Sequence, residues 1–258
     1  MKRPLTAAMA LLAATCAQAQ THATLDTRNA TVHLAYGGGF ATAHKEGSAG
    51  SLEPVGLDGP ALVSIAGADQ FVGDYLGWSV WWNMDWDIRQ TWFIDPRTQA
   101  LSGSGHTQLT QTHGLDGPGC PNCAASVAMT AHNWQDLQFT LDAPAPFAFH
   151  SEVSLHQGVQ INRWDEGRQR WLPFMGSVAG GVTDRLGTLG AGRWQVVSSR
   201  VIENISSGTP SLDESWSFSL TMPGVLWAVS AVPEPSPAWL LACSVGLLAW
   251  RRRGSPHA

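Results

Sequence analysis

Five of the chain's thirteen tryptophans fall within residues 78–92, and their indoles are the side chains best suited to hold a ligand. An indole has a large, flat apolar face, which can stack on a sugar ring or fill a protein core. Core burial is the expectation that we favour for any one of them. On a strand, Trp81 would lie on the face opposite to Val80 and Trp82. We predict Trp81 and Trp86 as polysaccharide contacts.

Acidic residues and histidines offer weaker chemistry. Asp85 and Asp87 are spaced i, i+2, so both carboxylates would lie on one face of a strand, where they could bind Ca²⁺ together with backbone carbonyls. A solvated strand edge explains the same spacing and is favoured. The nine histidines form no His-Glu-x-x-His motif, and Gly-x-Ser-x-Gly is also absent. We therefore predict no catalytic residue, no metal and no cofactor.

Cys120 and Cys123 form the single C-x-x-C motif of the chain. In an oxidising compartment, a disulfide that closes a tight loop is the simplest interpretation. Free thiols, a redox site and a zinc site that recruits His113 and His132 are the alternatives. The flanking sequence lacks the βαβ pattern typical of a thioredoxin-like site.

The first nineteen residues have the three parts of an export signal. Lys2 and Arg3 are followed by an apolar run over residues 7–14 and by an A-x-A cleavage site at Ala17 and Ala19. Cleavage there leaves Gln20 as the first mature residue. Lipidation of Cys16 is a weaker alternative, because a threonine precedes it.

The last twenty-seven residues have a second tripartite pattern. A proline motif precedes an apolar run over residues 238–250, and three arginines follow it. Thirteen apolar residues are short for a membrane helix, which needs about 20. Snorkelling arginines and interfacial tryptophans lengthen the segment, and the positive charge predicts a cytoplasmic C-terminal end. A buried core helix is the less favoured alternative. The motif residues are Val232, Pro233, Glu234 and Pro235, and the stop residues are Arg251, Arg252 and Arg253.

This tail resembles the PEP-CTERM sorting signal of exported Gram-negative bacterial proteins. The resemblance covers residues 232–258 only, so it says nothing about the body. It implies an exosortase-type membrane enzyme as partner, processing near the proline motif, and release to the cell surface or an extracellular matrix. Proteins with this tail are often found with exopolysaccharide systems. The two prolines favour an extended segment, as a processing site requires.

Composition limits what the intervening body can be. We predict a signal peptide over residues 1–19, one domain over residues 20–231 and the sorting tail over residues 232–258. The body has ten basic and nineteen acidic residues, a net charge of −9, which argues against a nucleic-acid partner.

Alternating patterns predict an all-β body, an antiparallel β-sandwich or jelly roll, between the signal peptide and a single C-terminal membrane helix. The clearest alternation runs from Phe147 to Leu155, and another runs from Trp216 to Met222. Residues 160–174 predict a hairpin in which Gly167 has a positive φ.

Several breaks are also predicted between short strands. They are the glycine run at residues 37–39, a loop over residues 41–60, separate strands over residues 78–82 and 91–94, a turn over residues 133–136, and glycine loops at residues 180–181 and 187–192.

The expected function is non-enzymatic. The chain is predicted to be an exported, at least transiently membrane-anchored protein of the cell surface or extracellular matrix, with an exosortase, the inner membrane and polysaccharide as partners. A secreted polysaccharide hydrolase or lyase is the alternative, and it requires a concave face that gathers tryptophans and two close carboxylates.

Overall fold

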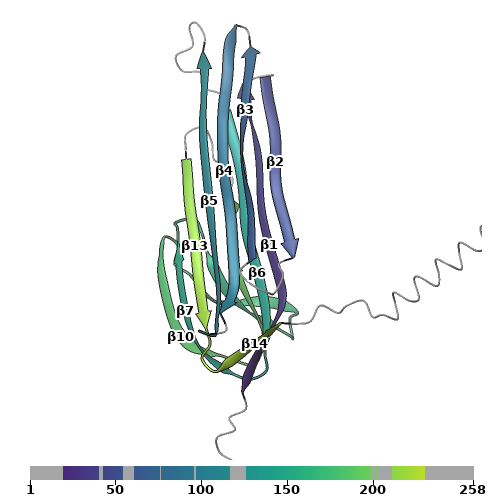
Figure 1. Ribbon diagram of the computed structural model, residues 1–258, viewed down its shortest axis with the longest axis vertical. Coiled ribbons are helices and arrows are strands. Elements are labelled where there is room, and N and C mark those ends of the chain that lie inside the picture. The colour runs from purple at the N-terminus through teal and green to yellow at the C-terminus, as the bar shows by residue number, and fades with distance from the viewer. Residues whose placement is uncertain are drawn as a thin grey trace, which may run out of the picture. The chain divides into compact units, whose positions relative to one another are not determined.

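In the computed structural model, every regular element of the described residues is a β-strand (Figure 1). The described residues are 20–40, 43–54, 61–75, 77–95, 97–116, 126–198, 201–202 and 211–229. The chain divides into two units, Met1–Ala228 and Val229–Ala258. Apart from Val229, the second unit lies outside the described residues, so the account below concerns the first.

Sheet A has the strand order β14-β1-β6-β11-β8-β9, with β2 paired to β1 and β12 paired to β6. Its long strands are β1 (Thr21–Phe40), β2 (Ala43–Pro54) and β6 (Ser126–Leu141). Its shorter strands are β8 (Val159–Asp165), β9 (Arg170–Gly176), β11 (Gly192–Ser198), β12 (Val201–Ile202) and β14 (Val225–Val229).

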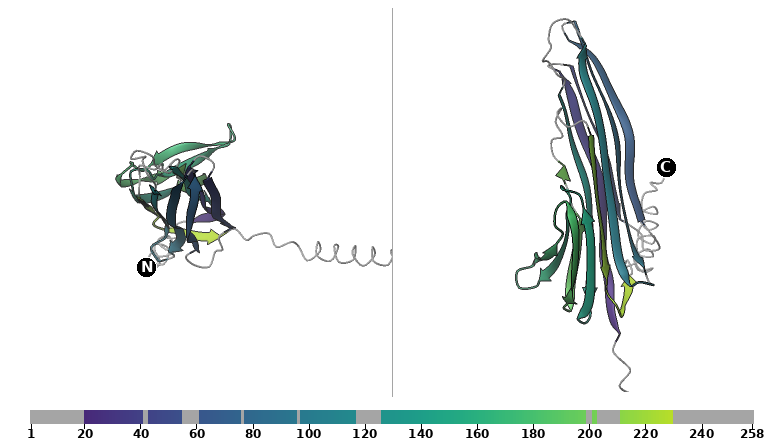
Figure 2. Two further views of the ribbon diagram at one scale, coloured as in Figure 1. Left: turned by 90° about the horizontal axis from the view of Figure 1, so that it is seen from above. Right: turned by 90° about the vertical axis from the view of Figure 1, so that its left-hand side faces the viewer.

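Sheet B has the order β10-β7-β13-β5-β4-β3. Its strands are β3 (Ala61–Tyr75), β4 (Trp78–Asp95), β5 (Ala100–Asp116), β7 (Ala145–Val153), β10 (Gly181–Leu189) and β13 (Ser211–Thr221). The two sheets lie face to face (Figure 2), and the neighbouring strands pair in antiparallel ladders. The prediction of an antiparallel β-sandwich is confirmed.

The strands are longer than the sequence predicted, and several predicted breaks are wrong. β1 continues through residues 37–39, because β2 and β6 both pair with it there. The predicted loop over residues 41–60 contains β2, and the two strands predicted over residues 78–95 are one strand, β4. β10 likewise continues through Gly187. Hydrogen bonding to neighbouring strands maintains these segments despite their glycines.

The predicted turn over residues 133–136 is also wrong, because β6 runs straight through it. Asn133 faces the interior and has a role there instead. Its Nδ2 lies 3.2 Å from each of three acceptors in sheet B: the backbone oxygens of Arg89 and His106, and Oγ1 of Thr107. In return, Gln90 Nε2 donates to the backbone oxygen of Trp134, at 3.0 Å. These hydrogen bonds connect the sheets across the interior.

Other predictions are confirmed. Phe147, Phe149 and Val153 of β7 are buried, as are Trp216 and Phe218 of β13. Leu155 lies beyond the end of β7 and is exposed, so the predicted alternation stops two residues early.

β8 and β9 form the predicted hairpin, but its positive φ (50°) is at Gln169 rather than at Gly167. Asp165 fixes the turn, since its Oδ1 accepts a hydrogen bond from the Arg168 backbone N–H at 3.0 Å. Asp165 therefore acts as a turn residue.

β14 is attached to the rest of the body through Gln99, a residue with positive φ (55°). The Gln99 backbone oxygen accepts from Met222 N at 3.1 Å and from Trp227 Nε1 at 3.3 Å. Its side-chain oxygen accepts from Gly224 N at 2.7 Å. The Trp227 ring packs against Phe139, with their centroids 5.3 Å apart. Since β14 neighbours β1 in sheet A, the first and last strands of the body lie side by side.

A recurrent packing unit is a ring that lies over a glycine directly opposite on the neighbouring strand. At each of these glycines, an added Cβ would come within 3.0 Å of the ring. The pairs are Tyr36–Gly47, His33–Gly50, Trp86–Gly67, Phe218–Gly103, Trp216–Gly105, Trp81–Gly114 and Phe147–Gly187. Because glycine has no side chain, each of these positions leaves space for the ring of the residue opposite.

Gly105→Ala tests this packing unit. Gly105 is buried beneath Trp216, itself 2% exposed, so the new methyl group must displace the indole. We expect the free energy of unfolding, measured by urea denaturation, to fall by about 1–3 kcal/mol. Gly158→Ala is the control, because nothing lies within 4 Å of its added Cβ, and it should change stability by less than about 0.5 kcal/mol. Equal stability of the two variants would contradict the packing argument.

Candidate functional site

The two tryptophans predicted as ligand contacts lie on opposite sides of sheet B. Trp86 points between the sheets and is partly buried against the core, with its ring centroid 5.4 Å from that of Tyr36. Trp82 and Trp92 are buried, at 0% and 2% exposure. Trp81 is half-buried on the outer face, opposite to its buried neighbours Val80 and Trp82. Of the two predicted contacts, Trp81 therefore has the side chain placed to meet a ligand.

Trp81 is held flat against the outer face of sheet B. Three of its ring atoms would lie 2.7–3.0 Å from a Cβ at Gly114, so the indole covers that glycine broadside. Its Nε1 donates to Asp116 Oδ2 at 3.1 Å, which fixes the ring in its plane. Val72, opposite on β3, is 71% exposed and extends the apolar surface. One face of the indole is thus committed to the sheet, which leaves the other for a flat apolar partner.

The same outer face has two polar hollows along β4 and β5. One, of about 370 Å³, is lined by Asp85, Asp87, Gln108 and Thr110, among others. The other, of about 590 Å³, is lined chiefly by the polar side chains of Arg89, Thr91, Ser104, His106, Glu152 and Ser217. Hydroxyl, imidazole and carboxylate groups of this kind suit a ligand that is rich in hydrogen-bonding groups.

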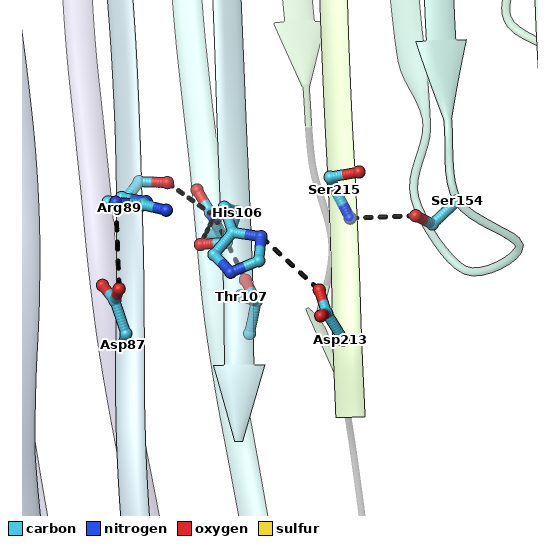
Figure 3. Close-up of polar contacts among 8 residues, drawn as sticks. Asp87, Arg89, His106, Thr107, Ser154, Asp213 and Ser215 are labelled. Carbon is cyan, nitrogen blue, oxygen red and sulfur yellow. Dashed lines mark hydrogen bonds and ion pairs between the residues drawn. The ribbon is translucent and has the colours of Figure 1, made fainter. Parts of the chain in front are cut away.

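The polar contacts between these hollows are loose (Figure 3). Arg89 Nη1 lies 3.9 Å from Asp87 Oδ2, and His106 Nδ1 lies 3.6 Å from Asp213 Oδ1. Both distances are long for an ion pair, and in each pair at least one side chain is more than half exposed, so each pair contributes little to stability. Their donors and acceptors are therefore available for exchange with a ligand at little cost.

The arrangement required for a hydrolase does not form among the described residues. Asp85 and Asp87 do share the outer face, as predicted, but Glu152 is on β7, separated from β4 by β5 and β13. The large buried indoles lie on the other side of the sheet from these carboxylates. Across the described ranges, no three His, Cys, Asp or Glu side chains are grouped to hold a metal.

A second polar cluster, which the sequence did not reveal, closes the edge between the sheets. Lys45 of β2 in sheet A donates to Asp69 of β3 in sheet B. Tyr36 of β1 donates from its hydroxyl to Asp69 Oδ2 at 2.7 Å. The Lys45 ammonium also lies 5.9 Å from the Trp82 ring centroid, within cation–π range. The one available signal was that Lys45 is the only lysine of the body.

This cluster shifts the ionisation of its members. Burial, with the hydrogen bond to Asp69, raises the pKa of Tyr36 to about 12, so the phenol remains a donor into alkaline solution. Burial opposes the ionisation of Asp69, but hydrogen bonds from Lys45, Tyr36 and the Gln70 N–H outweigh it and lower the pKa of Asp69. The carboxylate is thus stabilised in the folded protein, and the cluster connects the two sheets.

The other predicted site residues lie largely outside the described residues. These are Cys120 and Cys123, Ala17 and Ala19 of the signal, and the tail. The zinc alternative would need His113 of β5 and His132 of β6, which belong to different sheets. No described segment forms a helix with the length and apolar character needed to cross a membrane, and the predicted C-terminal span falls in residues that are not described.

Comparisons with known proteins give little further information. No family model and no curated protein matches the chain. Among solved structures, the chain is similar to a mutant of CBM29-2, a family 29 carbohydrate binding module used to probe ligand recognition. The match has a TM-score of 0.22 and 7% identity, and it covers 42% of this chain and 78% of that chain.

Asp69→Asn should destabilise the fold in a pH-dependent way. It removes the charged acceptor of Lys45 and Tyr36, so we expect a loss of about 1–2 kcal/mol at pH 7 in urea denaturation. Because the folded-state pKa is lowered, the carboxylate stabilises the fold above its unfolded pKa, about 4, and this stabilisation is lost as the pH falls through the folded value. The gap between wild type and variant should therefore shrink on going from pH 7 to pH 2.

Asp74→Asn is the control, since Asp74 is exposed on the same strand and makes no hydrogen bond or ion pair through its side chain among the described residues. A pH-independent gap, or an equal loss in the control, would show that the Asp69 contacts do not stabilise the fold as charged hydrogen bonds.

Proposed function

We propose that this chain is the precursor of an exported protein of the cell surface or extracellular matrix, which an exosortase-type membrane enzyme processes at its C-terminal tail. The body then contacts polysaccharide. The observation that carries this proposal is the order of the three tail parts behind an N-terminal export signal: proline motif, short apolar run, arginine cluster.

Each tail part has a physical role in that proposal. The apolar run is long enough to enter a membrane but short for stable anchoring. Arg251, Arg252 and Arg253 resist translocation and keep the C-terminal end in the cytoplasm. Pro233 and Pro235 keep the intervening motif extended and accessible on the other side. Cleavage there separates the body from its anchor.

The body supports a role in display. Because β14 neighbours β1, the first strand of the body and the strand that precedes the tail in the sequence are adjacent in sheet A. β1 has twenty residues, which at about 3.3 Å per residue extend for roughly 60 Å. Before cleavage, a body tethered through β14 would therefore hold the far ends of its long strands away from the membrane.

The proposed polysaccharide contact is the outer face of sheet B, at Trp81. A ring that lies flat over Gly114 and is fixed by Asp116 offers a preformed stacking surface. Val72 adds apolar area, and the polar hollows along β4 and β5 supply hydrogen-bonding groups. Such a site needs no rearrangement to bind, which favours affinity.

Mass spectrometry of the protein recovered from cells and from medium tests the sorting proposal. We expect a mature chain that begins at Gln20 and ends near Pro233 to Pro235. Replacing both prolines by alanine should leave the tail attached and the protein in the membrane fraction. Pro256→Ala, which changes a proline outside the motif, should be processed normally. Recovery of the full chain from Met1 to Ala258, or of soluble protein in the cytosol, would refute the proposal.

Trp81→Ala tests the polysaccharide contact. In affinity electrophoresis of the full chain, in nonionic detergent with the host's exopolysaccharide in the gel, the wild type should be retarded. The variant should bind about three- to tenfold more weakly, the effect expected for loss of one aromatic contact. Phe93→Ala is the control, since Phe93 is also exposed on β4, at 39%. Equal retardation of wild type and Trp81→Ala, with both folded by circular dichroism, would remove this contact and leave the sorting proposal intact.

A further inference from the structure

Two tryptophans and an arginine form a cluster on sheet A, whereas Trp81 lies on sheet B. Trp164 of β8 lies opposite Trp171 of β9, with ring centroids 5.2 Å apart and planes at 68°. Arg193 of the neighbouring strand β11 places its guanidinium carbon 5.0 Å from the Trp164 centroid and 5.7 Å from that of Trp171. Arg193 lies on the outer face, since the next residue, Trp194, is buried in the core.

The charge of Arg193 is not neutralised within the described part of the chain. Its side chain is exposed, and none of the described carboxylates lies within the 4.0 Å of an ion pair. By contrast, Arg168 on the same hairpin lies 3.7 Å from Asp165 Oδ2. The two indoles pack against the guanidinium of Arg193 and so orient it. The N–H groups project from the edge of that plane, so stacking leaves them free to donate.

The surrounding charge differs from that of the rest of the body. The hairpin and Arg193 together contain four arginines and two acidic residues, whereas the body as a whole has a net charge of −9. Asp165 is already engaged by Arg168 and by the turn. Acidic residues elsewhere on the body are screened beyond about 10 Å at 0.1 M salt. This corner is therefore locally cationic on an acidic protein. The residues counted are Arg163, Arg168, Arg170, Arg193, Asp165 and Glu166.

A hollow of about 500 Å³ borders the same hairpin. Trp164 and Arg163 line it, together with Leu172 and Phe174. Arg163 pairs with Trp194 and lies 5.8 Å from its ring centroid, so its guanidinium lies on the Trp194 side of sheet A, opposite to Arg193. The cluster of Trp164, Trp171 and Arg193 thus offers aromatic surface and an oriented cationic donor within one small region.

We propose that Trp164, Trp171 and Arg193 bind a carboxylated sugar residue of an acidic polysaccharide. The exposed part of an indole stacks on the C–H face of the sugar ring, and the Arg193 edge donates two parallel hydrogen bonds to the carboxylate. A uronic acid combines these two features in one residue. This site goes beyond the contact proposed at Trp81: it lies on the other sheet, takes a charged ligand, and needs neither the sorting tail nor Trp81.

Isothermal titration calorimetry with a defined oligosaccharide tests this proposal. The full chain in nonionic detergent is titrated with tetragalacturonate and, as matched ligand, with its methyl ester, which keeps the sugar rings and removes the charge. We expect tetragalacturonate to bind, and to bind about tenfold or more tightly than the ester. Its affinity should fall as sodium chloride is raised.

Three variants separate binding from folding. Arg193→Gln should weaken tetragalacturonate binding by about ten- to a hundredfold, the loss of charge-assisted hydrogen bonds. Arg193→Lys keeps the charge but loses the planar guanidinium that donates two parallel hydrogen bonds, so its affinity for tetragalacturonate should be intermediate. Arg185→Gln removes an exposed arginine of β10, for which no aromatic or acidic partner is found within the described ranges, and should bind as the wild type does.

Several results would overturn the proposal. They are no binding of tetragalacturonate, equal binding of its methyl ester, or unchanged binding by Arg193→Gln with an unchanged melting temperature. Binding to phosphatidylglycerol vesicles without binding to tetragalacturonate would assign the cluster to lipid instead. None of these results would alter the mass of the mature chain or the effect of Trp81→Ala, so this inference and the proposed function can fail separately.

Discussion

One steric constraint recurs in the architecture: several large rings lie over a glycine directly opposite on the neighbouring strand. In the interior, Trp216 and Phe218 occupy the space left at Gly105 and Gly103. On the outer face, Trp81 lies over Gly114 in the same way. Glycine ordinarily weakens a strand, since it has no side chain to pack, but here the ring from the neighbouring strand covers the gap. Trp81, Trp86 and Trp216 are accommodated in this way.

The sheets are also fixed relative to each other by polar groups in an apolar setting. Asn133 and Gln90 connect them in the interior, and Lys45 with Asp69 connects them at one edge. Buried polar groups are costly unless paired, so these contacts favour one relative placement of the sheets over a sliding hydrophobic interface. Both proposed ligand surfaces, around Trp81 and around Arg193, thus lie on strands of a rigid framework, where side-chain positions are preorganised before binding.

How much of this could be predicted from the sequence depended on whether a signal was local. The alternation from Phe147 and that from Trp216 predicted buried faces correctly, because a period of two is visible within one strand. The breaks predicted at residues 37–39 and 133–136 were wrong, because pairing with distant strands overrode local glycine and asparagine preferences. Trp81 could be separated from Trp82 by parity alone. Arg193 could not be linked to Trp164, since that contact exists only once the register of β8, β9 and β11 is known.

The attachment of β14 through Gln99 has a mechanical consequence. Tension applied beyond Val229 enters the body through β14, a strand of five residues. Gln99, the Trp227–Phe139 contact and the pairing of β14 with β1 would bear that load together. A pull on this end is therefore transmitted to β1, a strand of twenty residues that pairs with three neighbours in sheet A.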